Sequence, residues 1–137
     1  MGHKKEIDVA AALIFNGKKL LITKRPKGSH LEGMWEFPGG KQEPHETLPS
    51  CLEREIREEL GVDIIVDRPI LTVQHEYESR IIILHFFECS ILRGSPKGLD
   101  GQEIMWIAPA DLHGYTFPPP DKKILEYLSL REATEQS

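Results

Sequence analysis

One amphipathic helix constrains the fold of this 137-residue chain more than any other segment does. It is predicted within the segment from Gly40 to Val62, which reads GKQEPHETLPSCLEREIREELGV. Apolar residues recur at helical spacing from Thr47 to Leu60, and Gly61 stands where such a helix ends. The rest of the chain must therefore supply a surface that buries one face of this helix.

The same helix gathers three carboxylates on one side. On a helical wheel with Glu55 at zero, Glu59 falls near 40° and Glu58 near 300°. They overlap the edge of an apolar stripe that spreads from about 20° to 140° and is formed by Leu48, Leu52, Ile56 and Leu60. One interpretation is a solvated face on which Arg54 neutralises Glu58. We favour a cation site, because oxygen-rich clusters suit Mg²⁺ or Mn²⁺ together with phosphate oxygens.

The spacing of this segment resembles the Nudix box, G-x5-E-x7-R-E-U-x-E-E-x-G-U, in which U is a bulky apolar residue. Gly40, Glu46 and the run from Arg54 to Val62 match the pattern. The resemblance implies a Nudix-type α/β/α sandwich with a central mixed β-sheet, formed by a single domain over residues 1–137. It also implies an enzyme that uses Mg²⁺ (or Mn²⁺) to hydrolyse a pyrophosphate linkage.

The resemblance assigns a role to each matching residue. The carboxylates at Glu55, Glu58 and Glu59 bind the divalent cations in this family, and the backbone carbonyl of Gly39 joins them. Glu55 is also a candidate base for the attacking water. Arg54 orients the glutamates through a salt bridge.

Strand-like runs surround the helix, and their order predicts an α/β layered domain. Asn16-Gly17 predicts a type I′ hairpin, and residues 24–45 are predicted to form a long functional loop. A last helix is predicted with Asp121 as its N-cap. The predicted strands are Ile7–Phe15, Lys19–Thr23, Ile70–Gln74, Arg80–Cys89 and Gln102–Ile107, and the last helix is Asp121–Arg131.

Landmarks outside the box narrow the resemblance to MutT-like nucleoside triphosphate pyrophosphohydrolases. The loop that ends in Trp-Glu-Phe-Pro-Gly-Gly-Lys at residues 35–41 is similar to the MutT loop in length and sequence. The segment Phe-Pro-Pro-Pro-Asp at residues 117–121 resembles Phe-Pro-Pro-Ala-Asn of MutT. We therefore expect substrate to be bound by Arg25, His30, Phe37, Lys41, Arg80 and Asp121.

A further catalytic carboxylate is expected on the loop after the sheet, where MutT uses a glutamate. Asp100 occupies that place with a side chain one methylene shorter, and Glu103 lies close by. We take Asp100 as the candidate, and the sequence leaves the choice between the two open.

The preferred base depends on Asp121, where MutT has asparagine. An ionised aspartate only accepts hydrogen bonds, which suits the N1–H and N2–H of guanine, whereas a protonated one also donates, which suits cytosine. We expect sanitation of oxidised nucleotides such as 8-oxo-dGTP. The alternatives are hydrolysis of CTP or 5-hydroxy-dCTP, another Nudix diphosphatase activity and, more remotely, a non-catalytic module that recognises damaged bases.

Composition limits the partners. A net charge of −5 argues against nonspecific binding to a nucleic acid polymer. Apolar runs are shorter than the ~20 residues that span a bilayer, so a membrane partner is not expected. Two cysteines give no disulfide framework, which favours a cytoplasmic protein. We expect a small-molecule nucleoside triphosphate as substrate and a monomer or weak dimer.

Overall fold

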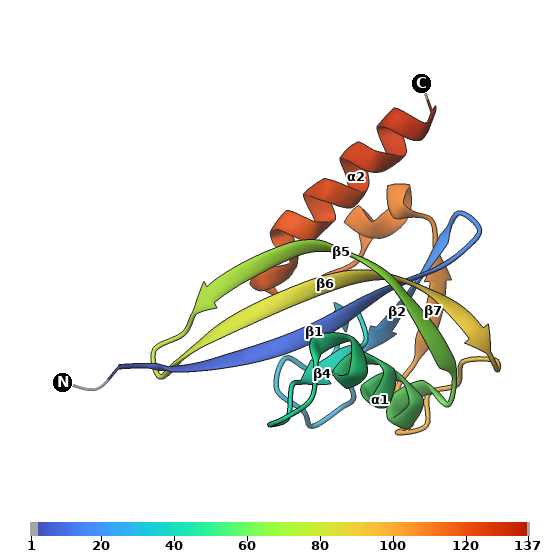
Figure 1. The fold of residues 1–137 in the computed structure, drawn as a ribbon. Helices are drawn as coiled ribbons and strands as arrows, with labels where there is room; N and C mark the ends of the chain where they lie inside the picture. Colours follow the sequence, from blue (N-terminus) through green and yellow to red (C-terminus); the bar gives the residue numbers. More distant parts are fainter. Residues whose placement is uncertain (1–2, 137) are drawn as a thin grey trace.

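The computed structural model describes residues 3–136. In this part of the chain, two α-helices lie outside one β-sheet (Figure 1). In chain order the elements are β1 (Lys5–Asn16), β2 (Lys19–Lys24), β3 (Trp35–Glu36), β4 (Gly39–Lys41), α1 (Leu48–Leu60), β5 (Asp63–Glu76), β6 (Arg80–Arg93), β7 (Ile104–Ile107), two 3₁₀ turns (Pro109–Gly114 and Pro119–Asp121) and α2 (Lys122–Gln136).

The sheet is mixed. Its path runs β3-β2-β1-β6-β5, while β4 also pairs with β1 and β7 with β2. Strands β1 and β6 are parallel, from the pair Lys5↔Arg80 to the pair Phe15↔Ser90, and the other pairs are antiparallel. A parallel pair needs a crossover connection, and the segment that contains β4, α1 and β5 provides it.

Helices α1 and α2 cover opposite faces of the sheet (Figure 1). Buried residues of α1, Leu52 and Ile56 among them, pack on the face that includes Ala12. Ile124 of α2 packs on the opposite face, which includes Leu13. Successive residues of β1 pack into opposite cores, because side chains alternate between the two faces of a strand. This arrangement confirms the predicted α/β/α sandwich with a central mixed sheet.

Local signals set the two ends of α1. Thr47 caps the first turn, since its Oγ1 accepts a hydrogen bond from the Ser50 N–H at 3.1 Å. Gly61 adopts a left-handed φ of 69° and donates its N–H to the carbonyl of Arg57 at 3.0 Å. The helix predicted from Thr47 to Leu60 is therefore confirmed to within one residue.

The first hairpin differs from its prediction. Strands β1 and β2 meet at the pair Asn16↔Lys19, so Gly17 and Lys18 are the central residues of the turn. Of these two, Gly17 alone has a positive φ, of 63°. The predicted type I′ turn centred on Asn16-Gly17 is wrong, because that type needs positive φ at both central residues. Glycine at the first central position is the pattern of type II′ turns.

Tertiary pairing extends several predicted elements. The segment predicted as a loop at residues 24–45 contains β3 and β4, which pair with β2 and β1. The strand predicted at Ile70–Gln74 begins at Asp63 and runs through Pro69. An edge strand with register shifts tolerates this proline. None of the helices in residues 3–136 combines the length and apolar character that crossing a bilayer requires.

Candidate active site

Helix α1 presents its three carboxylates at different depths. The side chain of Glu55 is 19% exposed, whereas that of Glu58 is 61% exposed. Glu59 is half-buried. Packing of α1 against β1 and β4 causes the difference, since it covers the inner edge of the acidic face. Glu55 and Glu59 therefore face the sheet, and Glu58 lies at the rim.

Arg54 ties the acidic residues together. Its Nη2 and Nε donate to the two carboxylate oxygens of Glu46 at 2.7 and 3.1 Å, and its Nη1 donates to Glu55 Oε1 at 2.9 Å. Glu46 also accepts the Glu43 N–H at 2.9 Å. The hydrogen bonds from Arg54, with that from Glu43, lower the pKa of Glu46 to about 2. Because a bidentate pair fixes the plane of the guanidinium, Arg54 can orient Glu55.

Two glycines of β4 allow the backbone to approach the carboxylates. A Cβ on Gly40 would lie 2.3–2.6 Å from the carboxylate atoms of Glu55. A Cβ on Gly39 would lie 1.9 Å from the carbonyl oxygen of Ala10. The backbone of Gly39 lies near enough to the Glu59 carboxyl to lower its pKa, against the larger raising effect of burial. Gly40 therefore lets β4 lie beside the acidic helix, and Gly39 lets it pair closely with β1.

The buried carboxylates are short of positive charge. Burial, together with the negative charges of Glu55, Glu36 and Asp100, raises the pKa of Glu59 to about 8. Burial also raises the pKa of Glu55, against the lowering effect of Arg54. A cation bound among these oxygens would offset their mutual repulsion and favour the ionised form of both carboxyls, which burial disfavours.

A cavity of about 420 Å³ opens beside these carboxylates. Gly39 and Glu59 line it, while Glu55 lies behind the wall residue Gly40. Arg54 and Glu58 are not among the lining residues. All the predicted substrate-binding residues line this cavity, namely Arg25, His30, Phe37, Lys41, Arg80 and Asp121.

Asp121 lines the cavity and is itself buried. Asp121 is only 6% exposed. Burial, together with the negative charge of Glu36, raises the pKa of the Asp121 carboxyl to about 7. The predicted role as N-cap is wrong. The helical run begins at Pro119, and Pro118 is its capping residue, so Asp121 lies inside the run. Proline is favoured in the first turn because it has no N–H to satisfy there.

Aromatic residues close one side of the cavity. Phe37 is 5% exposed and stacks on Phe117 with ring centroids 5.2 Å apart. Trp35 is also buried, but it packs edge-on against Tyr115 and is not among the lining residues of the cavity. Of the two, Phe37 is therefore the one placed to contact a base.

Comparison with known proteins agrees with this geometry. The NUDIX domain family matches residues 10–127. The chain belongs to the Nudix family. The CTP pyrophosphohydrolase of Escherichia coli (strain K12) is 38% identical over 130 residues, which cover 94% of this chain and 96% of the relative. The 8-oxo-dGTP diphosphatase of Haemophilus influenzae is 35% identical over 126 residues, covering 91% and 93%. The solution structure of the E. coli ORF135 protein superposes with a TM-score of 0.82 at 37% identity, covering 95% of this chain and 94% of that one.

As a Nudix hydrolase, the chain belongs to enzymes that generally use divalent metal ions, and its donors fit such an ion. Glu55, Glu59 and the Gly39 carbonyl offer only oxygen atoms, which are the donors that Mg²⁺ and Mn²⁺ prefer. Among the residues that the structure describes, no three His, Cys, Asp or Glu side chains converge enough to enclose an ion by themselves. An ion here would therefore depend on substrate phosphate and water for the rest of its shell.

The structure separates the two candidates for the additional Nudix carboxylate. A second hollow of about 160 Å³ is lined by Glu36, Glu59 and Asp100. Glu103 is not among its lining residues, and its Oε1 lies 3.9 Å from Lys24 Nζ. Asp100 thus shares a hollow with a predicted metal ligand, whereas Glu103 faces a lysine.

Sequence reasoning misses two residues of the Nudix cavity. Glu36 is half-buried and accepts a hydrogen bond from Arg25 Nη1 at 3.0 Å, and burial raises its pKa despite that partner. Tyr77, on the turn between β5 and β6, also lines the cavity, and the guanidinium of Arg80 lies 5.6 Å from its ring centre. The position of Glu36 beside Phe37 was a usable signal. Nothing in the local sequence marks Tyr77.

Proposed function

We propose that this Nudix hydrolase uses Mg²⁺ (or Mn²⁺) to cleave nucleoside triphosphates to the monophosphate and pyrophosphate. One observation carries the proposal: Glu59 and Gly39 line the same cavity as the buried Asp121. A nucleotide combines a polyanionic tail, which needs cations, with a base edge, which needs a hydrogen-bonding partner in a dry pocket. This cavity offers both in one space.

Glu55 is proposed as the base that accepts a proton from the attacking water. The water oxygen bonds to phosphorus while the bridging phosphorus–oxygen bond breaks, and its electron pair stays on the departing phosphate oxygen. Arg54 holds the Glu55 carboxylate through the 2.9 Å hydrogen bond. Asp100 is proposed to assist from the second hollow, which it shares with Glu59.

The divalent ion would be held by Glu55, Glu58, Glu59 and the carbonyl of Gly39. When bound, it neutralises phosphate charge and polarises the bond that breaks. Glu58 lies exposed at the rim, so its position supports a role as ion ligand less directly than the more buried positions of Glu55 and Glu59 do.

Cationic residues around the cavity are proposed to bind the phosphates and sugar. Arg25 is fixed, since its Nε donates to the His30 carbonyl at 2.5 Å and its Nη1 to Glu36. Lys41 follows Gly40 at the exposed rim and can place its ammonium on a phosphate. Arg80 and the imidazole of His30 complete the proposed set.

The substrate named for several relatives is 8-oxo-dGTP, which supports nucleotide sanitation. Two other observations favour cytosine as a second candidate base. Burial raises the pKa of Asp121 to about 7, so the neutral form is substantially populated near pH 7, and a neutral carboxyl can donate to N3 and accept from the N4 amino group of cytosine. The relative named CTP pyrophosphohydrolase supports the same choice. CTP or 5-hydroxy-dCTP is therefore the alternative substrate.

The deciding experiment is the ratio of kcat/KM values, with Mg²⁺, for 8-oxo-dGTP, dGTP, 5-hydroxy-dCTP and dCTP. Glu55→Gln serves as the blank, and its folding is checked by thermal melting. A preference for 8-oxo-dGTP would make the protein a sanitiser of oxidised guanine nucleotides. A preference for the cytosine pair would establish the alternative. Absence of turnover with all four would contradict the triphosphate proposal.

The remaining expectations are part of the same proposal. We propose a single Nudix domain that acts on small nucleotides in the cytoplasm, without a nucleic acid polymer or membrane as partner. A monomer or weak dimer is proposed as the state in solution. Sedimentation at several protein concentrations tests that state.

A further inference from the structure

A third hollow, of about 320 Å³, lies beyond the catalytic carboxylates. It shares Lys24, Arg25 and Gln102 as wall residues with the second hollow, the one that contains Glu59 and Asp100. It is formed between the loop after β2 and the loop before β7, so both of its sides belong to segments that flank the acidic helix.

The three hollows follow one another around Arg25. The nucleotide cavity and the second hollow share Arg25, Glu36 and Glu59 as wall residues. Asp121 lines the nucleotide cavity and neither of the other two. The carboxylates therefore lie between the proposed base site on one side and the third hollow on the other.

The third hollow also differs from its neighbours in charge. Lys24 and Lys27 line it, and no ion pair of Lys27 is formed with any residue in the described part of the chain. Its acids are Glu32, which accepts the Gly28 N–H at 3.0 Å, and Glu103, at 3.9 Å from Lys24 Nζ. Its cations are thus only loosely neutralised.

We propose that this third hollow is a diphosphate subsite, which binds the terminal phosphates of the substrate and then the pyrophosphate product. The inference rests on the proposed function. A triphosphate whose base lies at Asp121 and which is cut beside Glu59 must extend its last phosphates away from the base. The third hollow lies on that side, and Lys27 lines it as a cation without an ion pair in the described part of the chain, whereas Arg25 is paired with Glu36.

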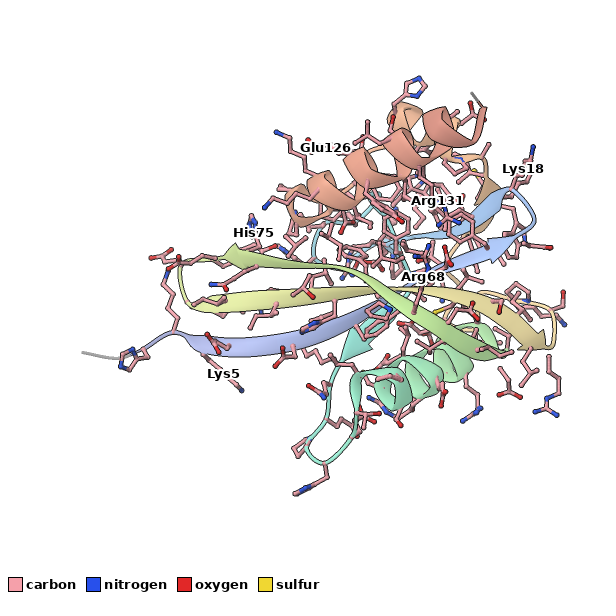
Figure 2. All side chains as sticks on the ribbon, turned by 45° about the horizontal axis from the view of Figure 1, so that its top comes forward. Lys5, Lys18, Arg68, His75, Glu126 and Arg131 are labelled. Carbon is pink, nitrogen blue, oxygen red and sulfur yellow. The ribbon has the colours of Figure 1, made fainter. Side chains whose placement is uncertain are left out.

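The test uses inorganic pyrophosphate as the probe, with Mg²⁺ present, and measures its binding to the whole protein by calorimetry. Lys27→Met should weaken binding about fivefold, the size expected for one exposed charge contact. Glu103→Gln should strengthen it, because Lys24 loses its opposing charge. The matched controls are Lys18→Met at the tip of the first hairpin and Glu126→Gln on α2 (Figure 2), and neither residue lines the hollow. Equal affinity in Lys27→Met and wild type, or equal losses in Lys27→Met and Lys18→Met, would overturn the subsite.

A kinetic comparison separates the subsite from the proposed function. For an enzyme that turns over triphosphates, Lys27→Met should lower kcat/KM about fivefold for the triphosphate and by a smaller factor for the matching diphosphate, since the diphosphate places one phosphate in the subsite instead of two. Equal losses with both substrates would contradict the subsite. If the wild type turns over no triphosphate, the proposed function fails, and the calorimetry still decides whether Lys27 binds pyrophosphate.

Discussion

Gly40 shows how one missing side chain can set the position of Glu55, the group proposed as the catalytic base. Its backbone lies so close to Glu55 that a Cβ would stand 2.3–2.6 Å from the carboxylate. The atoms in the way are the end of a flexible side chain, and backbone is not among the nearest contacts. An added methyl group would therefore displace the carboxylate more readily than it would disrupt the fold.

We predict that Gly40→Ala lowers kcat about a hundredfold while the melting temperature changes little, because a misplacement of about 1 Å is costly in catalysis. Steady-state kinetics and thermal melting measure the two effects. Gly114→Ala is the matched control, since a Cβ there meets nothing within 4 Å. A large fall in melting temperature for Gly40→Ala would show that the glycine supports the fold instead.

Asp121 couples the stability of the protein to pH. Its pKa in the folded protein is raised to about 7 from an ordinary value of 3.8, chiefly by burial. The folded state therefore keeps this proton over a range in which the unfolded state has lost it. Stability must fall as pH rises from about 4 to 7, by up to about 4 kcal/mol for this group.

We predict that Asp121→Asn removes this dependence. The variant should melt at a higher temperature than the wild type at pH 8, and the difference should vanish near pH 4, where both side chains are neutral. Thermal melting across that range measures it. A difference that stays constant with pH would mean that Asp121 ionises normally in the folded protein.

At the scale of elements, Arg54 joins α1 to the loop after β4. The bidentate contact with Glu46 fixes the guanidinium, and its remaining nitrogen positions Glu55. Lysine at position 54 would keep the charge but lose the planar fork that reaches both carboxylates. The geometry of the helix face, rather than its charge, is what this residue controls.

Arg54→Lys should therefore lower kcat about 10- to 100-fold, the usual cost of losing a partner that orients a metal ligand or base. Arg57→Lys is the control on the same helix, where Arg57 Nε bonds Asp63 at 2.8 Å on the exposed side. Kinetics of both variants at saturating substrate make the comparison. Equal activity in Arg54→Lys and wild type would leave Arg54 as a structural residue only.

At the scale of the whole molecule, ion binding and folding are linked. The acidic groups around Glu59 repel one another in the folded protein, and the repulsion is weaker in the unfolded chain, where they are separated. We predict that Mg²⁺ at about 100 times its dissociation constant stabilises the fold by about 2.7 kcal/mol. Chelation should abolish activity and leave the protein folded.

Calorimetric melting with and without Mg²⁺ measures this linkage. Glu59→Gln should lose most of the stabilisation, whereas Glu53→Gln, an exposed residue of the same helix, should keep it. Equal responses of the two variants would remove Glu59 from the proposed ion site.

Prediction from sequence was most successful where the signal was local. The caps of α1, its apolar stripe and the spacing of its glutamates are all set within residues 47–61, and the structure reproduces this helix. Prediction was least successful where hydrogen bonding between strands sets the bounds of an element. The strand β5 begins well before its predicted start, because its partner β6 provides hydrogen bonds from Asp63 onward, and an edge strand tolerates Pro69.

The sequence by itself determined the acidic helix, its glycine approach and the Nudix family to which they belong, because these depend on residue types at short fixed spacing. Only the tertiary structure decided the depth of each carboxylate and the choice of Asp100 over Glu103 as neighbour of Glu59. It also decided the burial of Asp121. Burial and the charge of distant neighbours set these properties, and both arise from contacts between segments far apart in the chain.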